Sequence, residues 1–350
     1  MAEHKIYQAS QDWLKRAVEA LTAAGLEVQA PVEDETGGVA LKQVESADAI
    51  ATDYLNLLVP LKRIFFPGTE VILEFENDED GGVTLNDPPE LPDGGVVVFG
   101  SRPCDAAALD VLDRVFQWDY DDVPYRTRRD RTTVVSFACT KPDATCFCTS
   151  VGGSPQGTLG SDVVAFAATD GGALLQVCSE KGEKLIEQLG DIVTPAPADA
   201  ALPEAPDVPT LFHTDRVKAW LDENFESDFW RGATLNCVGC AACSYLCPTC
   251  HCFDIVDEAA WNKGERRRNW DCCSFGLFTL HASGHNPRPD QAARYRQRVM
   301  HKFKYFPERF DAVACVGCGR CVRTCGMGQS LSRTVAAIEA NAEVGETTSA

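Results

Sequence analysis

The chain has 350 residues, of which 45% are hydrophobic and 24% are charged, and its formal net charge is −20. This composition is ordinary for a globular protein with a sizeable core, and the charge disfavours nucleic acid and anionic membranes as partners. No apolar run reaches the roughly 20 residues that a bilayer span requires, and the beginning of the chain lacks the apolar core of a signal peptide. We therefore expect a cytoplasmic protein without membrane insertion.

The first part of the chain, residues 1–193, has the pattern of a mixed α/β domain. Apolar residues at helical spacing predict helices, and alternating or continuous apolar runs predict strands. The expected helices are 10–26, 106–116 and 180–189, and the expected strands are 69–76, 95–100, 132–138 and a hairpin over 162–178. Asp105 is expected to cap the helix that follows it.

A proline- and alanine-rich stretch, residues 194–208, is the expected linker. Residues 209–335 then form a mainly helical, ferredoxin-like domain, with helical character between its two cysteine runs, and residues 336–350 form a polar tail. The chain therefore belongs to the α+β class by its pattern, with an α/β domain followed by a helical one.

Seventeen cysteines are present, an odd number, and most of them lie in close clusters. In a reducing compartment such clustering indicates metal or redox chemistry rather than disulfides. Two runs share the spacing C-x-x-C-x-x-C-x-x-x-C, and their cysteines are Cys237, Cys240, Cys243 and Cys247, then Cys315, Cys318, Cys321 and Cys325. This spacing is typical of [4Fe–4S] clusters, in which three cysteines of a run bind one cube and the fourth binds the other.

The spacing therefore assigns two crossed ligand sets. One cluster takes the first three cysteines of the first run together with Cys325, and the other takes the first three of the second run together with Cys247. Proline follows Cys247, as the pattern expects, whereas Gly326 stands at the matching place after Cys325. Paired C-x-x-C motifs also form zinc sites, but zinc leaves the third and fourth cysteine of each run without a role.

Two further groups of cysteines have no assigned role. Cys104 and Cys139 follow predicted strand ends, and Cys146 and Cys148 follow the loop after Cys139, so the four either converge on a third metal or cluster site or are buried or partly reactive thiols. The second group lies within the dicluster region, where it either shields the clusters or supplies another site, and it comprises Cys250, Cys252, Cys272 and Cys273.

The segment between the cysteine runs is basic in an otherwise acidic chain. Cations there would raise the potential of a cluster and suit an acidic docking partner, or they belong to solvated helix faces. The residues are Lys263, Arg266, Arg267, Arg268, Arg288, Arg294, Arg296, Arg298, Lys302, Lys304 and Arg309.

Several short motifs, taken with the cysteine runs, resemble the iron–sulfur beta subunits of cytosolic nickel–iron sulfhydrogenases, a group that includes a related iron–sulfur component of anaerobic sulfite reductase. The resemblance covers most of the chain. The motifs are residues 100–105 (GSRPCD), 145–152 (TCFCTSVG), 247–254 (CPTCHCFD), 270–273 (WDCC), 283–288 (SGHNPR) and 301–305 (HKFKY).

The resemblance implies an electron-transfer subunit with two [4Fe–4S] clusters and no substrate-turnover site. Such a subunit passes electrons between a flavin- and NAD(P)-binding subunit and a catalytic subunit. The expected catalytic partner is a nickel–iron hydrogenase core, and the alternative is a sulfite-reducing or other sulfur-redox subunit. A further alternative is a self-contained redox enzyme that uses the four N-terminal cysteines.

Overall fold

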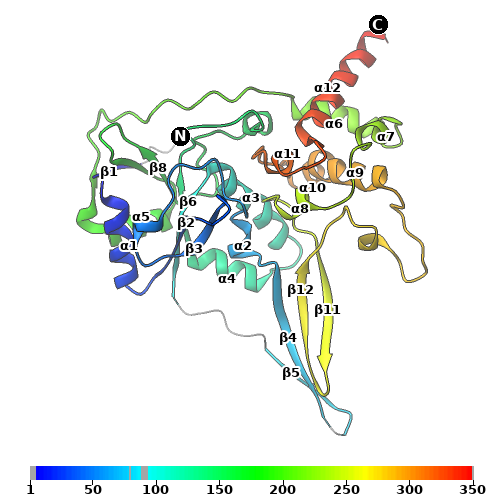
Figure 1. The fold of residues 1–350 in the computed structure, drawn as a ribbon, viewed down its shortest axis with the longest axis horizontal. Helices are drawn as coiled ribbons and strands as arrows, with labels where there is room; N and C mark the ends of the chain where they lie inside the picture. The colour runs from blue at the N-terminus through cyan, green and yellow to red at the C-terminus, as the bar shows by residue number, and fades with distance from the viewer. Residues whose placement is uncertain (1–4, 79, 88–93, 349–350) are drawn as a thin grey trace.

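The computed structural model describes residues 5–78, 80–87 and 94–348. Figure 1 shows an N-terminal region of sheet and helices, a C-terminal group of mostly short helices, and a narrow arm of strands that projects away from both. This arrangement confirms the α+β class expected from the sequence.

The N-terminal region is built on an eight-stranded mixed sheet. Its middle strands β2, β6, β7 and β8 run parallel, and the outer strands pair antiparallel to their neighbours. The order across the sheet is β10 (Val193–Pro195), β1 (Ile6–Ala9), β9 (Ala173–Val177), β8 (Val163–Ala167), β7 (Thr132–Phe137), β6 (Val96–Ser101), β2 (Glu27–Glu33) and β3 (Val39–Gln43).

Helices cover both faces of this sheet. Successive residues of β6, Val97 and Val98, enter two different cores, one with α1 and α5 and the other with α2, α3 and α4. Parallel strands that are buried on both faces need such near-continuous apolar runs. The helices are α1 (Trp13–Ala23), α2 (Lys62–Phe65), α3 (Pro103–Phe116), α4 (Val123–Arg131) and α5 (Glu180–Leu189), with short 3₁₀ turns at Ala47–Ala49, Cys148–Val151 and Gly190–Ile192.

The arm is a second sheet, formed by strands from both halves of the chain. Its order is β11 (Phe253–Ala260), β12 (Lys263–Trp270), β4 (Thr69–Asn77) and β5 (Val83–Asn86). Strand β12 pairs antiparallel with β4, so the segment between the cysteine runs begins as a hairpin rather than as a helix. At the base of the arm, Trp270 donates its indole N–H to the carbonyl of Phe66 at 3.1 Å.

The C-terminal helices surround the two cysteine runs and pack around Trp230, Phe303 and Val335. They are α6 (Thr214–Glu223), α7 (Phe229–Ala233), α8 (Ala242–Tyr245), α9 (Gln291–Met300), α10 (Phe306–Phe310), α11 (Arg320–Arg323) and α12 (Leu331–Thr348), with a 3₁₀ turn at Leu277–Thr279 and a π-helical turn at His301–Tyr305.

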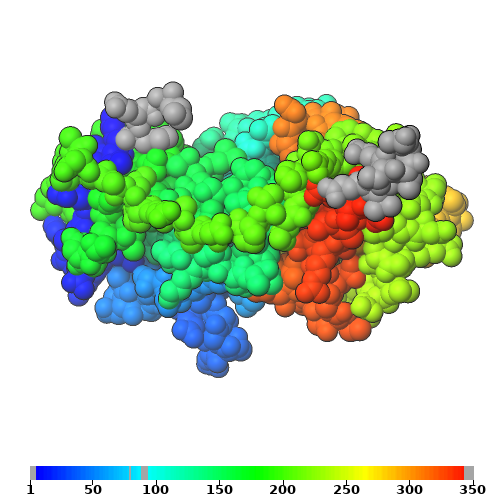
Figure 2. All heavy atoms as spheres, turned by 90° about the horizontal axis from the view of Figure 1, so that it is seen from above, coloured from blue at the N-terminus to red at the C-terminus, as the bar shows by residue number. Residues whose placement is uncertain are grey.

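Residues 196–213 connect the two regions and contain no helix or strand, while residues 194 and 195 of the expected linker belong to β10. Figure 2 shows this stretch crossing the surface from one region to the other. Helix α12 continues to Thr348, through residues that the sequence placed in a polar tail, because Ile338 is buried in the same core as α6. The last two residues of that expected tail lie outside the described part.

Asp105 does not cap α3, contrary to the sequence-based expectation. Arg102 takes the N-cap position, and Asp105 lies in the first turn of the helix, fully buried. Its carboxylate pairs with the buried guanidinium of Arg320, at 2.7 Å, so its role is to join α3 to the second cysteine run.

The arm is joined to the N-terminal region by a buried ion pair. Arg268 on β12 is 5% exposed and binds the carboxylates of Glu70 and Asp122. On the same strand, Arg266 pairs with Asp257 in solvent. We expect Arg268→Met to lower the free energy of unfolding by about 3 kcal/mol, because it removes the cation bound to the partly buried Asp122, whereas Glu70 keeps its ion pair with Arg128.

Arg266→Met is the matched control for this prediction and should change the free energy of unfolding by less than about 1 kcal/mol. Urea unfolding under anaerobic conditions measures both values. Equal effects of the two substitutions would show that the buried pair does not hold the arm.

Candidate functional site

The two cysteine runs fold in the same way. In each, left-handed residues flank the second cysteine: Gly239 and Ala241 on either side of Cys240, with φ of 71° and 65°, and Gly317 and Gly319 around Cys318 in the other run. A left-handed backbone curls the chain so that successive N–H groups face one concave space. This turn is what three cysteines need in order to surround one cube.

A short helix follows each turn and sets the place of the remaining cysteines. Helices α8 and α11 carry Cys243 and Cys321, and the fourth cysteine lies just beyond each helix. The amide of Cys247 donates to the carbonyl of Ser244 at 3.2 Å, and that of Cys325 donates to Val322 at 3.4 Å.

Cys247 lies near cysteines of both runs: a thiolate there acts to raise the pKa of Cys315, Cys318 and Cys321 in the second run and that of Cys243 in the first. Thr249 also donates its hydroxyl to the carbonyl of Ala314, at 2.8 Å, which ties the two runs together.

The other crossed ligand, Cys325, is held near the beginning of the first run. The side-chain amide of Gln329, four residues beyond it, donates to the carbonyl of Ala233 at 2.8 Å, and the Gln329 amide N–H donates to the Cys325 sulfur at 3.3 Å. These bonds bring Cys325 toward the first run without placing it against Cys237, and the crossed ligand assignment as a whole remains a prediction.

The two sites differ in burial and in charge. Cys240 of the first run is exposed, whereas Cys247 and Cys318 are buried. The sulfur of Cys237 accepts a hydrogen bond from the neutral amide of Gln291 at 3.3 Å. The sulfur of Cys247 accepts one from the ammonium of Lys302 at 3.4 Å.

Lys302 is the nearest cation to the second site. It is 3% exposed, and its ammonium also donates to the Thr249 hydroxyl at 2.9 Å and to the Ala314 carbonyl at 2.8 Å. Burial acts to lower its pKa, but the thiolates of Cys247 and Cys250 outweigh burial and raise the pKa of Lys302 above its ordinary value. The side chain is therefore charged.

A second buried cation lies between the two sites. Arg298 is 3% exposed and donates to the carbonyl of Cys243 at 3.0 Å, and its charge favours the thiolate forms of Cys243, Cys247 and Cys321. In the described part of the chain, the buried Nε of Arg298 and one terminal nitrogen of Arg320 have no hydrogen-bond partner. Unpaired cationic donors beside clustered thiols fit an anionic iron–sulfur cluster.

The basic segment is thus neither one docking face nor a set of solvated helix faces. Arg268, Arg298 and Lys302 are buried, and the last two lie against the cysteine runs. Sequence reasoning weighed the cations together and did not single these out. A π-helical turn at His301–Tyr305 breaks the helical spacing there, so no periodicity shows which way Lys302 points.

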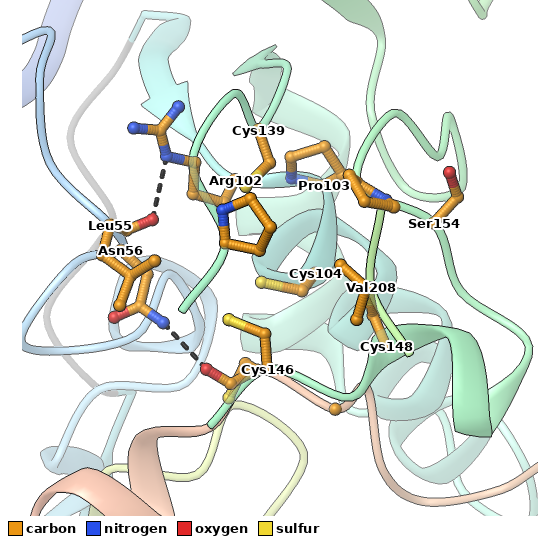
Figure 3. Close-up of a pocket in the computed structure, with 14 residues that line it drawn as sticks. Leu55, Asn56, Arg102, Pro103, Cys104, Cys139, Cys146, Cys148, Ser154 and Val208 are labelled. Carbon is orange, nitrogen blue, oxygen red and sulfur yellow. Dashed lines mark hydrogen bonds between the residues drawn. The ribbon is translucent and has the colours of Figure 1, made fainter. Parts of the chain in front are cut away.

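The four N-terminal cysteines lie around one hollow, shown in Figure 3, which they share with Cys318 of the second run.

A different group of cysteines gathers at the base of the arm, where the thiol of Cys273 contacts those of Cys252 and Cys272. A hydrogen bond from Cys273 lowers the pKa of Cys272 to about 5 and that of Cys252 to about 7.

Among the residues that the structure describes, no three His, Cys, Asp or Glu side chains converge as the ligands of a single metal ion do. The cysteines that hold a cube are spread over a larger volume, around its four iron corners. Within the same residues, no helix is long and apolar enough to cross a membrane.

Two comparisons with known proteins identify the class and then the family. Residues 236–329 match the 4Fe-4S dicluster domain family, so this region is a dicluster iron–sulfur domain and the protein carries iron–sulfur clusters. The chain is also similar to sulfhydrogenase 2 subunit beta of Pyrococcus furiosus, with 31% identity over 299 residues, which are 81% of this chain and 84% of the relative. The protein therefore belongs to the family of iron–sulfur beta subunits of sulfhydrogenases.

Lys302 offers a test of how the buried site is tuned. We expect Lys302→Met to lower the reduction potential of one cluster by roughly 50–130 mV. At an effective dielectric constant near 20, a unit charge beside a cluster ligand changes the free energy of reduction by about 1–3 kcal/mol. Redox titration followed by electron paramagnetic resonance measures the shift.

The control is Lys304→Met, in the same turn, where the ammonium pairs with Asp222 at 3.0 Å. It should leave both potentials within about 20 mV of the unaltered protein, because its charge is already neutralised near the surface. Lys302→Arg should retain most of the potential. An unchanged potential in Lys302→Met would contradict the role given to this cation.

Proposed function

We propose that this protein passes electrons between a flavin- and NAD(P)-binding subunit and the catalytic subunit of a cytoplasmic nickel–iron hydrogenase. The observation that carries the proposal is the pair of cysteine runs within a dicluster domain, in which Cys240 is exposed whereas Cys247 and Cys318 are buried. The sulfhydrogenase relative is itself a beta subunit by name, and a subunit that holds clusters without a substrate site needs partners on both sides.

The proposed ligand sets are Cys237, Cys240, Cys243 and Cys325 for the first cluster, and Cys315, Cys318, Cys321 and Cys247 for the second. When bound, each cluster accepts and releases one electron at a time. The chain's own residues hold the two groups side by side, since Cys247 leaves the first turn and reaches the second. Arg298 lies between them and favours thiolates on both sides.

The two sites lie at different depths, so the proposed electron-transfer route runs from the protein surface toward the interior. The first site reaches the surface at the exposed Cys240, where a partner can approach closely. The second is enclosed by the α3 side of the N-terminal region and by Lys302. Electrons that enter at one site therefore have a path into the interior of the complex. No residue of this chain is assigned a catalytic role.

The crossed ligands can be tested as a matched pair, Cys247→Ser and Cys325→Ser. After anaerobic purification, each variant should lose about four iron atoms and four sulfides relative to the unaltered protein, since each removes one corner of one cube. The two losses should concern different clusters. The cluster whose potential responds to Lys302→Met should persist in Cys325→Ser and be absent in Cys247→Ser.

Loss of the same cluster in both variants, or of the Lys302-sensitive one in Cys325→Ser, would refute the crossed assignment. Zinc in place of iron and sulfide would refute the electron-transfer function as a whole.

Partners are tested by anaerobic affinity purification of the full-length chain. The expected result is co-purification of a flavoprotein subunit and a nickel–iron subunit, with hydrogen-dependent reduction of NAD(P) by the complex and none by the isolated chain. A sulfite-reducing subunit in place of the nickel–iron one would establish the sulfite reductase alternative. Turnover by the isolated chain with an artificial donor would contradict an accessory role.

A further inference from the structure

One hollow in the N-terminal region is walled by thiols from three separate elements. Cys104 comes from the first turn of α3, Cys139 follows the end of β7, and Cys146 and Cys148 lie on the loop beyond it. Figure 3 shows these side chains gathered around the same space, with the sulfurs of Cys104 and Cys146 directed into it. The hollow has a volume of about 30 Å³ and is partly open to solvent.

The hollow directly adjoins the second cysteine run. Cys318 lines it together with the four N-terminal cysteines. The amide of Phe147 donates to the carbonyl of Gly317 at 2.9 Å. A Cβ on Gly317 would come within 2.4 Å of the Cys148 nitrogen, so the two loops touch backbone to backbone. A group bound in the hollow would therefore be separated from the second cluster by little more than the Gly317–Cys318 peptide.

The donor set of the hollow is made of sulfur. Its other lining residues are mostly apolar or proline, and none of them carries a carboxylate or an imidazole. Such an all-thiolate set selects iron–sulfur clusters, zinc or copper(I) over hard cations. Positive charge is available for an anionic cofactor from the buried Arg102 and from the N-terminus of α3, a helix of 14 residues.

A bound metal would use the four thiols of the hollow at once, because it displaces the protons of its cysteine ligands.

We propose that Cys104, Cys139, Cys146 and Cys148 hold a third iron–sulfur cluster, which exchanges electrons with the cluster bound through Cys318. The exchange moves one electron, so one cluster is oxidised as the other is reduced, and no bond forms or breaks. This inference rests on the proposed electron-transfer function, because a third redox centre has a use only beside the other two. It extends the route from the surface at Cys240 into the N-terminal region.

The test is the iron and sulfide content of the anaerobically reconstituted full-length protein. The unaltered chain should bind about twelve iron atoms, and the double variant Cys146→Ser/Cys148→Ser should bind about eight, since each cube contributes four. The Lys302-sensitive potential should remain in the variant. Cys178→Ser is the control, because this partly buried thiol after β9 does not line the hollow, and it should leave the count at about twelve.

Equal counts of about eight in the unaltered protein and the double variant would overturn the proposal, as would stoichiometric zinc that the double variant loses. If the double variant fails to fold, Cys139→Ser decides, since this residue lies at the end of a strand: a loss of iron supports the third cluster, and an unchanged count overturns it. The failure of the two-cluster assignment would look different, because Cys247→Ser would then retain its iron while the hollow variants still lost theirs.

Discussion

Thiolates that are buried together repel one another and lose their hydration, so they can be buried only if cations and N–H donors are buried with them. This requirement is met around the second cysteine run by Lys302, Arg298 and Arg320, all nearly inaccessible. Each of the three comes from a different element, and each also binds the backbone of a neighbouring segment. The cations that stabilise the buried thiolates therefore also hold the neighbouring elements in place.

The contact between the two regions follows from the same requirement. Arg320 lies within the second run, yet its guanidinium pairs with Asp105 of α3 and its Nε donates to the carbonyl of Leu57 at 2.8 Å. Close by, Arg323 pairs with Asp143 on the loop that carries Cys146. The dicluster domain is therefore not an independent ferredoxin appended by a linker, because the arginines of its second cysteine run pair with carboxylates of the N-terminal region.

Much of this could be predicted from the sequence, for physical reasons that are local. The cysteine runs determine their own turns, since the spacing alone requires left-handed residues and a short helix. The strands β6 and β7 and the helix α3 have periodic apolar patterns that tertiary contacts do not override. The sequence also indicated that Cys104 and Cys139 follow strand ends, and parallel strand ends meet at one edge of a sheet, whereas Cys146 and Cys148 reach the same hollow through the loop beyond Cys139.

What the sequence could not show depends on partners distant in the chain. Strand β12 lacks apolar alternation, and its partner β4 lies about 190 residues earlier in the chain. Strand β11 pairs only with β12 among the described strands and is exposed along nearly its whole length. Asp105 has the composition of a helix cap, but its partner Arg320 is 215 residues away, and only that pairing explains its burial. The direction of the Lys302 side chain could not be predicted for a different reason, because a π-helical turn changes the helical spacing there.

The depth of the two cluster sites and the charge around them act in opposite directions on reduction potential. Removing water from a cluster disfavours its more negative, reduced form and lowers the potential, whereas a buried cation or an N–H donor to sulfur raises it. By the proposed assignment, the first site is more exposed and has the neutral donors Gln291 and Gln329, the second is more buried and has Lys302, and Arg298 acts on both. Two clusters in such different surroundings can therefore have similar potentials, and similar potentials are what a route needs if electrons are to pass along it in either direction.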